Sequence, residues 1–197
     1  MVDKTCIVGI DEIGTGSIVG PFLVGGVRAP AEWSIDGLND SKQLTDKRRR
    51  VMNEKLLILA EQGVIQIAYA QRSNIEIDEQ GLYPMLKSAY KEVAQKLYRD
   101  DTKIIIDGNM DFTGYLDDYD YEVVVKADCK FSQVMAGSII GKVKRDDMLI
   151  QLATDYPDYD LENCKGYLSA KHLDGLQRYG RTIHHRKSYK LKALGEK

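Results

Sequence analysis

Runs of apolar and β-branched residues predict five β-strands, each bounded by polar or glycine-containing segments. The runs are residues 5–10 (TCIVGI), 21–29 (PFLVGGVRA), 64–71 (VIQIAYAQ), 103–107 (KIIID) and 121–128 (YEVVVKAD). Gly25 and Gly26, in the second run, allow either the close approach of another element or a β-bulge. Residues 30–46, which contain proline, glycine and the polar sequence NDSKQLT, are predicted to form a loop.

Segments in which apolar residues recur about every three to four positions predict four helices, at residues 46–63, 74–100, 132–155 and about 169–178. Thr45 is a candidate N-cap for the first helix and Gly63 its end. Pro84 is expected near the start of the second helix or at a kink within it, and small residues at 136–138 predict a closely packed face. Because strands and helices alternate after an initial strand pair, we predict an α/β fold, with a mixed sheet flanked by helices on both faces.

The composition is that of an ordinary globular protein, with 43% hydrophobic and 29% charged residues. The chain suffices for one core, so we predict a single domain over residues 1–197. No apolar run approaches the roughly 20 residues of a membrane span, and the start of the chain indicates no signal peptide. The few, widely spaced cysteines argue against disulfides or zinc and predict small buried thiols in a cytoplasmic protein: Cys6, Cys129 and Cys164.

Positive charge is concentrated towards the C-terminus, although the whole chain has a net charge of −2. Residues 165–197 contain nine Lys and Arg residues and two acids, a net charge of +7, whereas residues 1–164 carry −9. A segment of this kind can be a basic arm that binds nucleic acid. It can equally be a solvated, helix-rich C-terminus, and the charge pattern alone leaves both interpretations open.

Acidic residues end three of the predicted strands: Asp11 with Glu12, then Asp107, then Asp128. Ligands bind beyond the strand ends of open α/β sheets, so these acids can converge although they are distant in sequence. Four carboxylates without a Cys or His cluster suit hard ions such as Mg²⁺ or Mn²⁺. Two such ions about 4 Å apart can promote phosphodiester hydrolysis. Each acid can also be a simple cap or turn residue, and the pattern does not decide between these roles.

The sequence GIDEIGTGSIVGP, residues 9–21, joins two of these acids to a glycine-rich segment. Successive residues of a regular strand point to opposite faces. We therefore expect Asp11 and Glu12 to reach one site only where the strand ends. Gly14 and Gly16 permit a turn there and let the backbone approach a sugar or phosphate. Bound metal ions would reverse the repulsion between the acids and a phosphate.

Six blocks of the sequence, in order over about 180 residues, resemble the type 2 ribonucleases H, the ribonuclease HII family. The blocks are GIDEIGTGSIVGP, DSKQLTDKRR (40–49), DGN (107–109), KADCKFSQVMAGSIIGKVKRDD (126–147), YPDYDLENCKGYLSAKH (156–172) and HRKSY (185–189). The resemblance implies an RNase H-like mixed sheet with a basic, helical C-terminal extension over about residues 150–197. It implies an endonuclease that cuts the RNA-containing strand of RNA/DNA duplexes, including 5′ of single ribonucleotides embedded in DNA, and leaves 3′-OH and 5′-phosphate ends. Such an enzyme would serve ribonucleotide excision repair and DNA replication.

By this resemblance, the catalytic and metal-binding residues are Asp11, Glu12, Asp107 and Asp128, and they would hold two Mg²⁺ or Mn²⁺ ions. Asp11 would bridge both ions. Glu12 and Asp107 would complete the coordination of one ion, and Asp128 that of the other. Asp146 is expected to be a helix-surface acid of secondary importance.

The resemblance also assigns nucleic-acid contacts to Gly14, Thr15, Gly16, Lys42, Tyr167, Arg186 and Lys187. Lys42 would contact a duplex phosphate, and Tyr167 would stack on the sugar that follows the ribonucleotide. Without such roles, Lys42 is an exposed loop lysine and Tyr167 a half-buried packing residue. The family usually carries Gly-Arg-Gly where this chain has Gly-Thr-Gly. Backbone recognition of the 2′-hydroxyl can persist here, but the side chain of the arginine is absent.

The histidines and the end of the chain carry less defined expectations. Four residues are expected to help hold the backbone or the C-terminal tail: His172, Arg186, Lys187 and Ser188. His172 is also a candidate proton shuttle. His184 and His185 can equally be surface residues. The expected partner of the whole chain is an RNA/DNA hybrid or a DNA duplex with embedded ribonucleotides, bound by a monomer.

Three other interpretations fit parts of the sequence. The pattern DE-x-GTG also resembles the ribonuclease HIII group, which prefers longer RNA stretches, but KAD, KGY and HRKSY favour type 2. GIDEIGTGS resembles the first phosphate loop of sugar kinases with an actin-like fold, with Glu12 as an insertion. Those kinases are far longer than this chain. A nonenzymatic nucleic-acid binder would use only the basic C-terminus and would leave the four acids unexplained.

Overall fold

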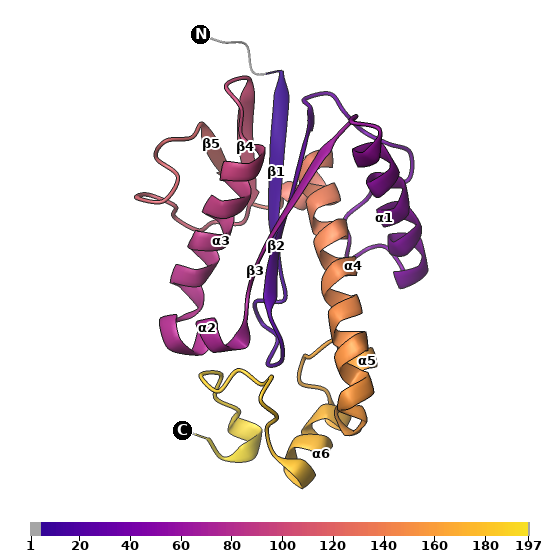
Figure 1. The fold of residues 1–197 in the computed structure, drawn as a ribbon, viewed down its shortest axis with the longest axis vertical. Coiled ribbons are helices and arrows are strands. Elements are labelled where there is room, and N and C mark those ends of the chain that lie inside the picture. Colours follow the sequence, from indigo (N-terminus) through magenta and orange to yellow (C-terminus); the bar gives the residue numbers. More distant parts are fainter. Residues whose placement is uncertain (1–4, 197) are drawn as a thin grey trace.

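A computed structural model describes residues 5–196, which contain a five-stranded sheet (Figure 1). The strands are β1 (Cys6–Ile13), β2 (Phe22–Pro30), β3 (Gln66–Arg72), β4 (Thr102–Asp107) and β5 (Tyr121–Val124). Their order across the sheet is β3-β2-β1-β4-β5, so β1 is central. β2 is antiparallel to β1 and β3, whereas β4 is parallel to β1 and β5. The sheet is mixed, which confirms the predicted fold class.

Helices cover both faces of the sheet, on opposite sides of the strands in Figure 1. α2 (Asn74–Gln80) and α3 (Leu82–Leu97) lie against one face. α4 (Ser132–Asp155) lies against the other, and α1 (Asp46–Glu61) packs on α4. α1 begins as predicted, because the Thr45 side chain accepts a hydrogen bond from the backbone N–H of Arg48.

Glycines let α4 cross close to β1 and β2. A Cβ atom on Gly9 would lie 2.2 Å from the backbone nitrogen of Val134, and one on Gly137 would lie 2.9 Å from the carbonyl oxygen of Gly25. β2 keeps a continuous register through Gly25 and Gly26, so these glycines provide close packing and not a bulge. This contact fixes the part of α4 that lies beside the acidic residues of β1.

The helix predicted over residues 74–100 is in fact two helices. Gly81 separates α2 from α3 with φ of +85°, a conformation that other residues rarely adopt. Ser73 and Glu76 form a reciprocal cap at the start of α2. Pro84 lies in the first turn of α3, where its missing N–H has no helical partner to lose.

The last predicted strand, residues 121–128, is shorter than expected, and Asp128 does not end it. β5 stops at Val124, Val125 is exposed, and Lys126 has a left-handed φ of +58°. Asp128 lies in the following 3₁₀ turn (Ala127–Cys129). Because Val125 has no core contact that would extend the strand, the chain turns early and brings Asp128 back to the sheet edge.

The three cysteines differ in exposure. The prediction of buried thiols is wrong for Cys129, which is exposed, while Cys6 and Cys164 are partly buried and all three are free. Across residues 5–196, no helix combines the length and apolarity needed to cross a membrane.

The C-terminal part packs against the end of α4 and the loop after β1, below the sheet in Figure 1. α5 (Leu161–Cys164) and α6 (Ala170–Tyr179) are short. Their apolar residues form a separate cluster with Ile18, Val19 and Leu149. Several basic side chains are paired with acids: Lys171 with Asp160, Arg178 with Asp174 and Arg181 with Glu196. The described part of the basic segment is therefore packed and partly neutralised, and it is not a free arm.

Candidate functional site

Three of the predicted carboxylates line one hollow at the end of the sheet. Asp11 and Glu12 come from β1, and Asp107 ends the neighbouring β4. The parallel register pairs Ile10 with Ile106, so the next residues of the two strands, Asp11 and Asp107, lie side by side. The hollow has a volume of about 310 Å³, and its other lining residues include Gly14, Thr15, Lys42 and Tyr167.

Asp11 and Glu12 point towards opposite faces of the sheet, and each has a hydroxyl partner. Asp11 accepts a hydrogen bond from Ser138 in α4, whereas Glu12 accepts one from Tyr90 in α3. β1 stays paired with β2 through Ile13, so the expectation that the strand ends at the acids is wrong. Both carboxylates reach the hollow because β4 pairs with β1 only as far as Ile10, which leaves that edge of β1 open.

Asp11 is a buried carboxylate with too little positive charge around it. It is 6% exposed. Its pKa is raised from 3.8 to about 7, first by burial, then by the charge of Glu12 and, more weakly, by that of Asp107, whereas Ser138 and Lys42 lower it. A cation among these oxygens would favour the charged form. This donor set of buried carboxylate oxygens fits a hard divalent ion.

Asp128 lies beside this hollow and is held by Lys42. The Lys42 ammonium donates to the Asp128 carboxylate at 2.9 Å, and both residues line a second hollow together with Asp107. Asp107 accepts a hydrogen bond from the backbone N–H of Ala127 at 2.6 Å, which ties the turn that carries Asp128 to the end of β4. The four predicted carboxylates therefore surround two adjoining hollows that share Asp107 and Lys42.

Asp40 is a further carboxylate at this site, which sequence reasoning did not single out. Among residues 5–196, the one group of three possible metal ligands whose atoms lie within 4.8 Å of one another is Asp40, Asp128 and Cys129. The pKa of the Cys129 thiol is raised by desolvation and by the charge of Asp128, so Cys129 offers a thiol and not the thiolate that binds metals. Asp40 and Asp128 are thus the relevant oxygen donors of this group.

Residues 14–16 form a turn whose carbonyl groups are held by the C-terminal part of the chain. Arg186 is fully buried and donates to the carbonyls of Gly14 at 2.9 Å and Thr15 at 2.7 Å. The Tyr189 hydroxyl also donates to the Thr15 carbonyl, at 2.5 Å. The prediction that Arg186 contacts nucleic acid is therefore wrong, because its guanidinium faces protein backbone. The amides of Thr15 and Gly16 form no hydrogen bond within residues 5–196.

Arg145 of α4 supports the same region from below. Its buried guanidinium donates to the carbonyl oxygens of Pro21 at 3.0 Å, Lys165 at 3.0 Å and Val19 at 3.2 Å. Burial lowers its pKa to about 10, which leaves it charged at neutral pH. Sequence reasoning missed Arg145, because an arginine on a helix is usually exposed and nothing in the sequence marks this one as buried.

Tyr167 lies beside both Arg145 and the 14–16 turn. The Arg145 guanidinium is 5.8 Å from the centre of the Tyr167 ring, within cation–π range. A Cβ atom on Gly16 would lie 3.8 Å from the ring, so the ring borders the turn. Tyr167 is nevertheless 44% exposed. The structure thus presents an aromatic ring at the rim of the carboxylate hollow.

The remaining candidates have mixed outcomes. Lys187 has an exposed side chain, and its backbone N–H donates to Asp78, which also accepts two hydrogen bonds from Ser188. Asp146 is 2% exposed and ion-paired with Lys142 at 2.6 Å, so the expectation of a surface acid is wrong. His185 is fully buried, which excludes the alternative that it is a surface residue.

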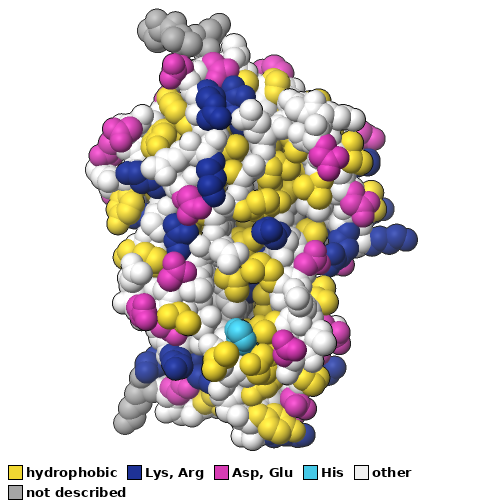
Figure 2. All heavy atoms as spheres, viewed as in Figure 1, with side chains coloured by type: hydrophobic (Ala, Val, Ile, Leu, Met, Phe, Trp, Pro, Cys, Tyr) yellow, Lys and Arg dark blue, Asp and Glu magenta, His cyan; other side chains and the backbone are white. Residues whose placement is uncertain are grey.

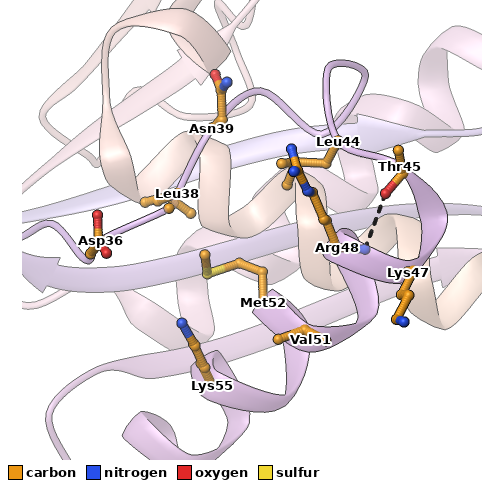
Figure 3. Close-up of a pocket in the computed structure, with 11 residues that line it drawn as sticks. Asp36, Leu38, Asn39, Leu44, Thr45, Lys47, Arg48, Val51, Met52 and Lys55 are labelled. Atoms are coloured by element: carbon orange, nitrogen blue, oxygen red, sulfur yellow. Dashed lines mark hydrogen bonds between the residues drawn. The ribbon is translucent and has the colours of Figure 1, made fainter.

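Neither the volume of the hollow nor the charge of the surface in view distinguishes the candidate site from the rest of the molecule. The larger hollow beside α1 has a volume of about 720 Å³ and contains none of the predicted site residues. Figure 3 shows Met52 near its centre, with Arg48 and Lys55 to either side. Figure 2 shows acidic and basic side chains interspersed on the face in view, without a broad patch of one sign. The convergence of carboxylates distinguishes the smaller hollow.

The sequence is similar to that of ribonucleases HII along nearly its whole length. The model of the ribonuclease HII family matches residues 8–192. The chain is 36% identical to the ribonuclease HII of Aliarcobacter butzleri over 188 residues, which cover 95% of this chain and 92% of that protein. It is 37% identical to the ribonuclease HII of Francisella tularensis subsp. novicida over 186 residues, which cover 93% and 96%.

The fold is similar to those of ribonucleases of types HII and HIII. The RNase HII in a PCNA:RNase HII complex from Archaeoglobus fulgidus has a TM-score of 0.76 at 23% identity, covering 94% of this chain and 95% of that one. Bst-RNase HIII in complex with Mn²⁺ has a TM-score of 0.75 at 19% identity, covering 99% of this chain but 71% of that one. Fold likeness therefore does not separate the two types, whereas the family model and the sequence identities do. The chain belongs to the ribonuclease HII family of endoribonucleases, which cleave RNA in RNA/DNA hybrids.

Proposed function

We propose that this chain hydrolyses the RNA-containing strand of RNA/DNA duplexes, and that it also cuts 5′ of single ribonucleotides embedded in DNA. The products would be 3′-OH and 5′-phosphate ends. The observation that carries the proposal is one hollow in which carboxylates, the 14–16 turn and the exposed Tyr167 ring face the same space. Cleavage chemistry and the recognition of a sugar can therefore act on adjacent atoms of one strand.

Four carboxylates are proposed to hold two divalent ions, Mg²⁺ or Mn²⁺: Asp11, Glu12, Asp107 and Asp128. The raised pKa of Asp11 and its place between Glu12 and Asp107 support this assignment. When bound, the ions would supply positive charge for the scissile phosphate and Lewis acidity for its hydrolysis. Tyr90 and Ser138 would orient the Glu12 and Asp11 carboxylates through their hydroxyl groups.

The 14–16 turn is proposed to recognise the ribose. Its Gly14 and Thr15 carbonyls are occupied by Arg186 and Tyr189, whereas the amides of Thr15 and Gly16 have no acceptor within residues 5–196. An amide N–H can donate to a 2′-hydroxyl, the group that distinguishes RNA from DNA. This arrangement needs no long side chain at position 15 and can therefore operate with Thr15.

Tyr167 and Lys42 are proposed to bind the sugar–phosphate backbone. The Tyr167 ring would stack on the sugar after the ribonucleotide and favour a deoxyribose there. Lys42 is 73% exposed at its side chain and stands between the two hollows, so its ammonium can turn from Asp128 to a phosphate. Lys187 would add a peripheral phosphate contact, and the protein is proposed to act as a monomer.

A cleavage assay on three duplexes tests this proposal. In all three duplexes the uncut strand is DNA. The cut strand contains one ribonucleotide, four ribonucleotides or RNA throughout. Each duplex is assayed with Mg²⁺ and with Mn²⁺. We expect a cut 5′ of the single ribonucleotide with at least one metal. Cleavage of the longer RNA substrates alone would instead indicate a preference like that of the ribonuclease HIII group.

A further inference from the structure

Two buried histidines contact each other directly beneath the proposed recognition surface. Nε2 of His172, in α6, lies 3.1 Å from Nε2 of His185, which follows α6 in the chain. Both residues are fully buried. Two like ring nitrogens at this distance require one to donate and the other to accept, because each neutral ring carries one N–H.

The neighbours of His185 determine which of its nitrogens carries the proton. The backbone N–H of Thr182 donates to Nδ1 of His185 at 2.9 Å, and the Thr182 hydroxyl lies 2.9 Å from the same atom. A backbone amide can only donate, so Nδ1 accepts and its proton must be absent. The proton of neutral His185 is therefore on Nε2, which points at His172.

The direction of the remaining hydrogen bonds follows. Nε2 of His172 accepts from His185, so the proton of His172 is on Nδ1. That atom lies 2.9 Å from the carbonyl oxygen of Tyr167 and donates to it. The same carbonyl also accepts from the backbone N–H of Ser169 at 3.0 Å. The chain of donors thus runs from Thr182 through both rings to the backbone of Tyr167.

The surroundings keep both rings neutral. Burial lowers the pKa of both histidines, to about 4 for His185, where His172 and the charges of Arg181 and His184 also lower it. The hydrogen bond to the Tyr167 backbone and then Asp160 raise the pKa of His172, and the hydrogen bond to the Thr182 backbone raises that of His185, but burial outweighs them. The other neighbours are uncharged at neutral pH, namely the Cys164 thiol at 3.5 Å from Nδ1 of His172 and the Tyr159 ring. A second proton would point an N–H of His185 at the backbone N–H of Thr182, or an N–H of His172 at the N–H of His185, and would break this series of hydrogen bonds.

The His185 end of this series of hydrogen bonds is joined to the loop that follows the 14–16 turn. His185 pairs with Val19 through an isolated antiparallel bridge, and the backbone N–H of Arg186 donates to the carbonyl of Ile18 at 2.9 Å. The two rings therefore connect the backbone beside the ribose-reading turn to the backbone of Tyr167. A histidine pair that only filled the core would not need to end on the residue whose ring is exposed at the site.

We propose that His172 and His185 are positioning residues for ribonucleotide reading, in which the fixed tautomers Nδ1–H on His172 and Nε2–H on His185 hold the Tyr167 backbone at a set distance from the 14–16 turn. The inference rests on the proposed role of Tyr167. It gives His172 no part in proton transfer to the substrate, because its ring is buried and both nitrogens are engaged within the protein.

A matched pair of substitutions at His172 isolates the hydrogen bond to Tyr167. In His172→Asn the amide nitrogen takes the place of Nδ1 and keeps the donor, whereas in His172→Gln it takes the place of Nε2 and loses it. Both changes remove the ring, and the void is larger by one methylene group in His172→Asn, so thermal unfolding of each variant controls for stability. His184→Gln is the control for loss of a histidine outside the pair, since the His184 side chain contacts the Tyr156 ring instead.

The readout is the ratio of cleavage rates on the duplex with one ribonucleotide and the duplex with a long RNA stretch, with Tyr167→Ala as the reference. We expect the ratio to fall about threefold to tenfold in His172→Gln, the scale of one neutral hydrogen bond, and to change less than twofold in His172→Asn. If the ratio falls in Tyr167→Ala but is the same in His172→Gln and His172→Asn, the positioning role is overturned while the role of Tyr167 stands. If the ratio does not fall in Tyr167→Ala, Tyr167 does not read the ribonucleotide, and the positioning role of the histidines is overturned as well.

A second measurement is independent of activity. Nitrogen-15 spectra of the histidine side chains report which ring nitrogen carries the proton. We expect His172 as the Nδ1–H tautomer and His185 as the Nε2–H tautomer at pH 7, with the His185 resonances shifted in His172→Gln. The reverse tautomers, or a charged ring on either residue at pH 7, would overturn the proposal.

Discussion

Asp11 and Arg145 are both buried charges beside the same hollow, yet their surroundings differ. Asp11 lies among other carboxylates, and its pKa is raised to about 7. Arg145 donates to three backbone carbonyls and remains charged, and Arg186 is satisfied by carbonyls in the same way. The acidic side of the hollow, Asp11 with its neighbouring carboxylates, lacks positive charge to balance it. The basic side, Arg145 and Arg186, has its hydrogen bonds satisfied within the protein. Unbalanced buried charge is typical of sites that bind an ion or react, and satisfied buried charge fixes geometry.

The largest expected effect is the loss of cleavage in Asp11→Asn. Removing a carboxylate that would bridge two ions should lower the cleavage rate at least about a thousandfold, because such ions contribute several kcal/mol to the transition state. Duplex binding, measured by fluorescence anisotropy, should remain. Cleavage within tenfold of the wild-type rate would contradict the assignment of Asp11.

The same substitution should stabilise the metal-free protein. Asn removes a charge that is costly to bury, so the free energy of unfolding in a chelating buffer at pH 7 should rise by about 1 kcal/mol or more. Mg²⁺ or Mn²⁺ should raise the melting temperature of the wild type more than that of Asp11→Asn. A lower stability of the metal-free variant would mean that Asp11 is already balanced within the protein.

Arg145→Gln should have the opposite effect on stability. Three carbonyl oxygens lose the guanidinium donor, and among residues 5–196 only that of Val19 keeps another, from Ser17, so the free energy of unfolding should fall by about 3 kcal/mol or more. Arg178→Gln is a suitable control, because Arg178 is 64% exposed at its side chain and its ion pair with Asp174 should contribute less than about 1 kcal/mol. Urea unfolding compares the two, and equal losses would show that the buried guanidinium is not needed to hold the loop.

Gly14→Ala and Gly16→Ala form a second matched pair. Gly14 has φ of +84°, and a Cβ atom there would lie 2.0 Å from Nε of Arg145, whereas a Cβ atom on Gly16 would meet only the Tyr167 ring, at 3.8 Å. We expect Gly14→Ala to lower the free energy of unfolding by about 2 kcal/mol and Gly16→Ala by less than about 1 kcal/mol. Equal effects in urea unfolding would contradict the tight packing of Arg145 beneath the turn.

The acidic side and the histidine pair also predict pH dependences of opposite sign in metal-free protein. Folded Asp11 keeps its proton up to about pH 7, whereas the unfolded chain releases it near 3.8, so stability falls as pH rises between these values. Folded His185 binds a proton only near pH 4, whereas the unfolded chain binds one near 6.5, so stability falls as pH drops through this range. Each proton contributes a slope of about 1.4 kcal/mol per pH unit.

Urea unfolding from pH 4 to 7 separates these two contributions. Relative to the wild type, Asp11→Asn should make the free energy of unfolding rise more steeply with pH. His185→Gln should make it rise less steeply, and His184→Gln should change the slope less. Slopes that change in the same direction for Asp11→Asn and His185→Gln would refute the contrast between the two sides.

The sequence predicts the sheet and most of the acidic side well, because apolar runs that lead into acidic residues are local patterns. Asp11, Glu12 and Asp107 lie together as expected, since a parallel pairing places the ends of β1 and β4 at one edge. Asp128 is less predictable, because its position depends on an early turn at Lys126 that the apolar run YEVVV does not reveal.

The basic side is hidden from sequence reasoning. Apart from the Tyr189 hydroxyl beside Arg186, the acceptors of Arg145 and Arg186 are backbone carbonyls far away in the sequence, which any residue provides. The His172–His185 contact depends on the fold of α6 and the segment after it. Composition predicts a basic surface here, whereas packing turns several of these cations inward. Burial of polar groups is a tertiary property and leaves no periodic pattern in the sequence.

Catalytic and sugar-reading groups are proposed to share one hollow, and substitution of Tyr167 separates their contributions. The measurement is the ratio of cleavage rates on single-ribonucleotide and long RNA/DNA duplexes for the wild type, Tyr167→Ala and Tyr167→Phe. Loss of stacking should lower the ratio about tenfold or more in Tyr167→Ala, while Tyr167→Phe, which keeps the ring, should stay within about threefold of the wild type. Equal losses on both substrates in Tyr167→Ala would contradict the account.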